Sequence, residues 1–217
     1  MKTIIVKGVG TVSARPDLVV LSLSLETVDQ TYEVAMNKAA EKIGELNSSL
    51  AKVGFEKESV KTIDFDVRTD YESEKDRSGN YRRVFNGYVV KHRLKVSFDF
   101  DTKVLAQVLS AISTCIAHPE LSVRFTVKDP SAINEALLVS ATENAQKKAE
   151  ILCAAMGSKL GEIVSIDYNW GELDIYSRTR YEVEDDCKCL MAAPMSIDIE
   201  PDDIDTADSV TFVWEIL

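Results

Sequence analysis

Two cysteines separated by a single residue have the clearest capacity for chemistry in this sequence. Cys187 and Cys189 lie in an acidic segment, and two thiolates this close could bind a soft metal such as Cu(I) or Zn. A zinc site commonly takes four ligands from two separated pairs, but no second pair or histidine is nearby. Acidic neighbours also disfavour the thiolate form. We predict no metal and no cofactor, and keep thiol or soft-metal binding by Cys187 and Cys189 as the alternative function.

The two histidines lack the neighbours of an acid–base catalyst. His92 falls among apolar residues of an alternating segment, where we expect a hydrogen-bonded core side chain. His118 precedes a proline in an expected loop. Asp64 and Asp66 share one face of a predicted strand, a pattern typical of a solvated surface. Because no spacing suggests a nucleophile with its base, we predict no catalytic residues and a protein that is not an enzyme.

A pair of glycines near the start resembles the beginning of a nucleotide-binding loop. Gly8 and Gly10 follow an apolar segment, but that loop needs a third glycine and a helix directly after it. Residues 15–17, Arg-Pro-Asp, are typical of a turn instead. We therefore interpret the two glycines as a bulge or bend in an edge strand.

The charge is strongly acidic and unevenly distributed. The chain of 217 residues has 25 Lys and Arg against 36 Asp and Glu, a net charge of −11. After Arg180 there are 11 acidic residues and one lysine, whereas the first 180 residues are nearly neutral. This balance argues against a nucleic-acid partner, because phosphate contacts need clustered Lys and Arg.

The apolar segments are too short for a membrane span or a signal peptide. No stretch reaches the roughly 18 apolar residues that a spanning helix needs. Lys7 ends the first apolar run, which begins at Ile4, so it is shorter than the apolar core of a signal peptide. We expect a globular protein with no membrane span, located in the cytoplasm.

The hydrophobic periodicity predicts an α+β fold of antiparallel or mixed sheets packed with three main helices in layers. The element order is ββαββαβαβββ. We predict strands at 3–13 and 18–28, pairing as a hairpin, then a helix at 29–53, strands at 58–72 and 81–99, a helix from 101, a strand at 121–127, a helix at 129–156, and strands at 160–170, 194–199 and 208–217, with 171–193 irregular. Residues 1–217 are predicted as a single domain, with 1–100 and 101–217 as candidate sub-domains.

The strand at 81–99 alternates an apolar face with a basic one. Lys91, Arg93 and Lys95 share the basic face, which is most simply a solvated sheet surface and, as the alternative, an interaction surface. This strand and the one before it exceed the usual strand length, so they form a long β-hairpin. Because exposed strand edges tend to pair with another chain, we predict a homo-oligomer with an otherwise unknown protein partner.

Taken in order, these signals resemble the SIMPL-domain family. The resemblance rests on residues spread over nearly the whole chain: Val6-x-Gly8-x-Gly10, Pro16-Asp17, Gly54, Lys61-Thr62 with Phe65 and Val67, Gly87-Tyr88, Ala141, Ala145, Lys148-Ala149, Leu152, Gly157, Leu160-Gly161 and Pro194. It implies bacterial relatives that are often exported to the periplasm or envelope, some immunogenic, some linked to oxidative stress and some forming ring-like homo-oligomers. An animal member is similar to a signalling adaptor. No catalytic residues are established for the family, so the resemblance implies none in this sequence.

These observations together predict a non-enzymatic scaffold or interaction protein. The prediction that no catalytic residues are present rests on residue types and spacing. The prediction of self-assembly rests on the long β-hairpin with exposed strand edges. The connection to a stress response comes only from the family resemblance.

Overall fold

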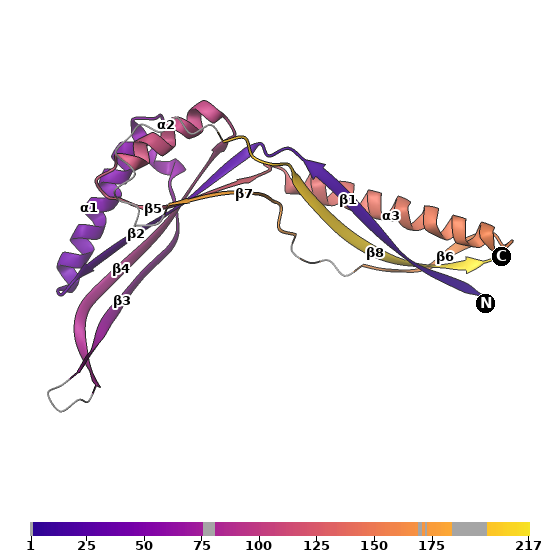
Figure 1. Ribbon diagram of the computed structural model, residues 1–217, viewed down its shortest axis with the longest axis horizontal. Helices are drawn as coiled ribbons and strands as arrows, with labels where there is room; N and C mark the ends of the chain where they lie inside the picture. Colours follow the sequence, from indigo (N-terminus) through magenta and orange to yellow (C-terminus); the bar gives the residue numbers. More distant parts are fainter. Residues whose placement is uncertain (1, 76–80, 169–170, 172, 184–198) are drawn as a thin grey trace. The chain divides into compact units, whose positions relative to one another are not determined.

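The computed structural model describes residues 2–75, 81–168, 171, 173–183 and 199–217. Within them the chain has three α-helices and eight strands, an α+β fold whose element order roughly matches the prediction (Figure 1). The strands are β1 (Thr3–Ala14), β2 (Leu18–Asp29), β3 (Lys61–Lys75), β4 (Tyr81–Asp99), β5 (Glu120–Thr126), β6 (Leu160–Asp167), β7 (Tyr176–Val183) and β8 (Ile204–Ile216). The α-helices are α1 (Tyr32–Ala51), α2 (Thr102–Ser113) and α3 (Pro130–Ala155), and a short 3-10 helix, η1 (Lys57–Ser59), precedes β3.

The chain divides into two compact units. The first contains Met1–Asp17, Phe125–Thr179 and Pro201–Leu217, and the second contains Leu18–Arg124 and Arg180–Glu200. The prediction of a single domain over residues 1–217 with candidate sub-domains at 1–100 and 101–217 stays a prediction.

The first unit is built on a three-stranded antiparallel sheet in the order β1-β8-β6. β1 pairs with β8 without interruption, from Thr3 opposite Glu215 to Ala14 opposite Ile204. The predicted hairpin between the first two strands is therefore wrong. The turn after β1 is fixed by Asp17, whose backbone N–H donates to the carbonyl of Thr126 at 3.0 Å and whose Oδ1 accepts from the N–H of Lys128 at 2.8 Å. Alternation predicted the strand correctly but carries no information about its partner.

Helix α3 lies against this sheet at very close range, and glycines make the approach possible (Figure 1). A Cβ added to Gly8 would lie 2.0 Å from the carbonyl oxygen of Ala141, and one added to Gly10 would lie 2.1 Å from that of Leu137. Because β1 pairs in unbroken register, the predicted bulge at the two glycines is wrong, whereas the alternative of a bend stays a prediction; β1 is an edge strand as expected. The small-residue stripe of α3 and the apolar face of the sheet form the core: Val6, Ala141, Ala145, Ala149, Val210, Phe212 and Trp214.

The second unit is built on a five-stranded sheet in the order β3-β4-β2-β5-β7. β3 and β4 run side by side as the predicted long hairpin (Figure 1). Helix α1 packs on β2 and β4 and also contacts α2. α2 begins as predicted at Asp101, whose Oδ1 accepts from the N–H groups of Lys103 at 2.7 Å and Val104 at 3.1 Å. Helix α1 thereby covers one face of this sheet.

Strand β7 corrects the expectation that residues 171–193 are irregular. Its sequence, Tyr-Ser-Arg-Thr-Arg-Tyr-Glu-Val, has no alternating apolar face, so the period-two signal is missing. The strand forms because it adds to the edge of the sheet beside β5. Residues 184–198, which include most of the predicted strand at 194–199, lie outside the described residues.

Replacing Gly8 by alanine tests the close contact between β1 and α3. We expect Gly8→Ala to lower the free energy of unfolding by about 1–3 kcal/mol, because the added Cβ meets helix backbone that cannot move independently. A matched control is Gly44→Ala on the exposed side of α1, where an added Cβ meets nothing within 4 Å. This control should gain roughly 0.5–1 kcal/mol. Urea unfolding followed by circular dichroism measures both, and an unchanged Gly8→Ala midpoint would contradict the contact.

Candidate functional site

The face of the five-stranded sheet that α1 does not cover carries polar side chains. We call it the open face. On β4, Lys91, Arg93 and Lys95 point to it, whereas the alternating residues His92, Leu94 and Val96 are buried on the helix side. On β2, Ser22 and Ser24 point to the open face between the buried leucines at 21, 23 and 25. The structure thus brings the three predicted cations into one row on the side of the sheet opposite α1.

Acidic residues of neighbouring strands compensate part of this basic row. Arg93 donates from Nε at 3.0 Å and from Nη2 at 2.6 Å, both to Oδ2 of Asp64 on β3. Lys91 lies opposite Asp66 on one side and Glu26 on the other. The Arg93 and Asp64 side chains are 53% and 40% exposed, so this ion pair contributes at most about 1 kcal/mol to stability. Its more definite consequence is to hold the guanidinium in one orientation.

Lys95 has a different setting from the other two cations. It lies opposite Ser22 on β2 and opposite Lys61 on β3. Two like charges directly opposite each other across a strand pair are unfavourable. In the row of Lys91, Arg93 and Lys95, the first two cations therefore face acidic residues, whereas Lys95 faces another cation.

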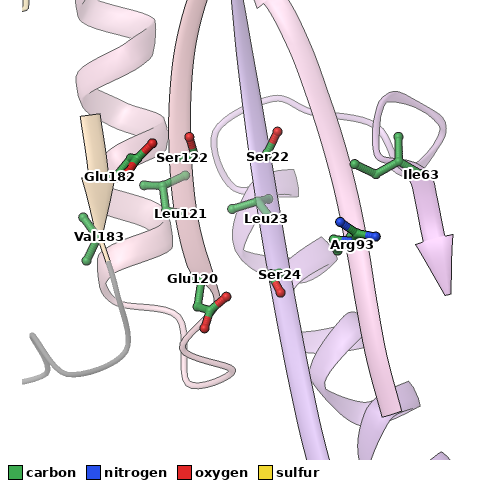
Figure 2. Close-up of a pocket in the computed structure, with 10 residues that line it drawn as sticks. All are labelled: Ser22, Leu23, Ser24, Ile63, Arg93, Glu120, Leu121, Ser122, Glu182 and Val183. Carbon is green, nitrogen blue, oxygen red and sulfur yellow. The ribbon is translucent and has the colours of Figure 1, made fainter. Parts of the chain in front are cut away.

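A pocket of about 420 Å³ lies on the open face. Figure 2 shows Ser24 of β2 between Glu120 of β5 and Arg93 of β4. The lining residues come from all five strands or their ends: Ser22, Leu23, Ser24, Ile63, Arg93, Glu120, Leu121, Ser122, Glu182 and Val183. The pocket therefore combines a cation on one side, two acids on the other and serine hydroxyls between them.

The hydroxyl of Ser24 is the most unusual polar group in this pocket. Its oxygen is buried and has no hydrogen-bond partner among the described residues. Buried hydroxyl groups in proteins nearly always have a partner, so this group is one that a bound molecule can satisfy. Among the pocket residues, only Arg93 was singled out from the sequence. Alternation of serine with leucine in β2 was a usable signal for Ser22 and Ser24, but nothing in the sequence connected them with Glu120 or Glu182.

His92 lies on the opposite side of β4 and takes no part in the pocket. Its Nε2 makes a 2.8 Å hydrogen bond with the hydroxyl of Thr62, and its ring contacts Phe65 edge to face at 5.0 Å. This confirms the prediction of a hydrogen-bonded core histidine. Burial lowers the pKa of His92 below its usual 6.5. His118 lies in the loop between α2 and β5, as predicted.

The described residues include two cysteines, no metal-binding cluster and no membrane-spanning helix. Cys115 and Cys153 are free and buried, whereas Cys187 and Cys189 lie outside the described residues. In the part of the chain that the structure describes, no three His, Cys, Asp or Glu side chains are grouped so as to hold a metal ion. None of the described helices has the length and apolar character needed to cross a membrane.

Comparison with known proteins gives one family and two relatives. The model of the SIMPL family, described as a protein of unknown function (DUF541), matches residues 4–214. The 26 kDa periplasmic immunogenic proteins of Brucella abortus (strain S19) and Brucella melitensis biotype 1 are each 26% identical over 163 residues. The matched region is 75% of this chain, and the chain spans 65% of the length of these curated relatives.

The buried histidine makes stability depend on pH in a defined direction. Because the pKa of His92 is lowered in the folded state, the unfolded chain binds a proton more readily below about pH 6.5. Folding stability from this group is therefore complete above pH 6.5 and is lost as the pH falls from there toward the folded pKa. We expect His92→Gln to flatten the pH dependence of urea unfolding between pH 8 and pH 5. His118→Gln serves as the control, and equal slopes in both variants would refute the assignment.

Proposed function

The chain belongs to the SIMPL family, whose function is unknown, and within it we propose a non-enzymatic interaction protein that self-assembles through the five-stranded sheet. The observation that carries this proposal is the open face, where charged side chains form rows on neighbouring strands and α1 covers only the opposite side. A rigid sheet that presents charge at fixed strand spacing suits recognition of another surface. The buried hydroxyl of Ser24 on this face has no base within hydrogen-bond distance among the described residues.

The charges on this face favour an acidic partner surface. Lys61 and Lys95 lie opposite each other across β3 and β4, and their mutual repulsion is relieved when an anionic group lies between them. The chain itself has 36 acidic residues against 25 basic ones, so a second copy can provide such groups. Electrostatic complementarity of this kind mainly sets the register and rate of association.

The edge of the same sheet supports pairing between copies. β3 is an edge strand of 15 residues, longer than most strands. Ile63 and Phe65 on it are 56% and 46% exposed. Long exposed edges with apolar side chains readily add a strand from another chain. We take a homo-oligomer as the assembly that this edge favours.

The location and biological process belong to the same proposal. Both Brucella relatives are named as periplasmic, which supports a periplasmic location for this protein. The cytoplasmic location expected from residues 1–7 has no support from these relatives. A contribution to a stress response stays a prediction that rests on the family resemblance alone.

Reversing the charge of Lys95 tests the proposed interaction surface. We expect the wild-type protein to be oligomeric at micromolar concentration and Lys95→Glu to weaken association by about tenfold or more. Higher salt should weaken the wild-type assembly as well, because exposed charges are screened. Native mass spectrometry and light scattering measure both effects.

The matched control for this experiment is Lys147→Glu on the exposed side of α3. It makes the same change of charge away from the open face and should leave assembly unchanged. A wild-type protein that stays monomeric over the micromolar range, without a recoverable partner, would reject the proposal. Equal weakening by both variants would reject the open face as the contact surface.

A further inference from the structure

Opposite charges line two sides of the pocket on the open face. Arg93 on β4 has two of its nitrogens on Asp64, but a guanidinium has five N–H donors, so donors remain for a second anion. On the other side, Glu120 of β5 and Glu182 of β7 have no ion pair or side-chain hydrogen bond with any described residue. A simple anion would be repelled by the two acids, and a simple cation would leave the remaining donors of Arg93 without an acceptor. A molecule that carries both charges can satisfy both sides.

Hydroxyl groups lie between the two charged sides. Ser22, Ser24 and Ser122 line the pocket, and Ser24 lies directly opposite Arg93 in the pairing of β2 with β4. A serine hydroxyl can both donate and accept, so it can bind an amide N–H or an amide carbonyl. The buried oxygen of Ser24 is without a partner among the described residues and is the group that gains most from such a bond. Amide groups between the two charges of the ligand fit this part of the pocket.

The strand order sets the separation between the charges. β2 lies between β4 and β5, and neighbouring strands are about 4.8 Å apart, so Arg93 and Glu120 start from backbones roughly 10 Å apart. An extended chain covers at most about 3.5 Å per residue, which gives roughly 7 Å for two residues and 10 Å for three. A free amino acid, at about 3.5 Å, covers only about a third of this backbone separation, so two or three residues match it better. The cavity of about 420 Å³ lies within the ordinary range for small-molecule sites.

We propose that this pocket binds a short zwitterionic peptide of two or three residues. Its carboxylate lies at Arg93, its ammonium lies at Glu120 and Glu182, and its backbone amide bonds to Ser24. Asp64 acts as a positioning residue because it fixes the guanidinium without filling the pocket. The inference concerns the pocket by itself and holds whether or not the open face binds a second copy.

A series of glycine peptides tests the charge separation directly. Saturation-transfer-difference NMR on the full chain measures the binding of glycine, diglycine, triglycine and tetraglycine. We expect the strongest binding for diglycine or triglycine, with a dissociation constant of about 1 mM, as suits a ligand of this size. N-acetyl-triglycine lacks the ammonium and triglycine amide lacks the carboxylate. Each should bind about tenfold more weakly or worse.

Variants connect the binding to named residues. We expect Glu120→Gln and Arg93→Gln each to weaken triglycine binding by about tenfold. Asp64→Asn keeps the guanidinium and should have a smaller effect. Glu143→Gln on the exposed side of α3 is the matched control and should leave binding unchanged. Circular dichroism of each variant verifies that it is folded.

Three results would overturn the inference. They are no binding of any peptide up to about ten times the expected dissociation constant, equal binding of the blocked and free peptides, and equal binding by Glu120→Gln and the wild type. The same titration on Lys95→Glu, which should weaken assembly and changes no pocket residue, distinguishes a failure here from a failure of the proposed self-assembly.

Discussion

The antiparallel pairing of β1 with β8 is the interaction on which the fold of the first unit depends. It joins residues from the beginning and the end of the chain over twelve consecutive pairs without a register shift. Since a slip of one residue would turn every side chain to the other face, this register decides which side chains form the core. It places Val6 beside Phe212 and gives α3 a continuous apolar surface. The second unit is built from two segments between these strands, Leu18–Arg124 and Arg180–Glu200.

That register also explains the small residues in the first unit. Gly8 and Gly10 lie on the side of β1 that faces α3, where carbonyl groups of the helix approach so closely that no side chain fits. On the helix, the residues that face the sheet are alanines at positions 141, 145 and 149, all fully buried. A glycine pair that looks in the sequence like a loop for phosphate or a distortion of a strand is therefore a packing device. Its geometry leaves no room for a ligand at these two positions.

The second unit uses its sheet differently, and this difference supports a binding function. Helix α1 covers one side of the sheet, so apolar residues alternate with polar ones along β2 and β4 and the polar ones remain on the open face. Strand pairing fixes each charge relative to the next, as with Arg93 between Asp64 and Ser24. The same arrangement that suits recognition by a larger surface also forms the pocket. His92, buried on the other side, contributes to stability and not to this surface.

The sequence by itself determined the α+β class, the starts of the helices near residues 101 and 129, and the core position of His92, because these depend on local periodicity and on side chains bonding to their own helix ends. It also placed Lys91, Arg93 and Lys95 on one face. Only the tertiary structure decided that β1 pairs with β8, that β7 exists and that Glu120 and Glu182 share a pocket with Arg93. Strand pairing joins residues far apart in the chain, and the alternation within each strand is the same whichever partner it has.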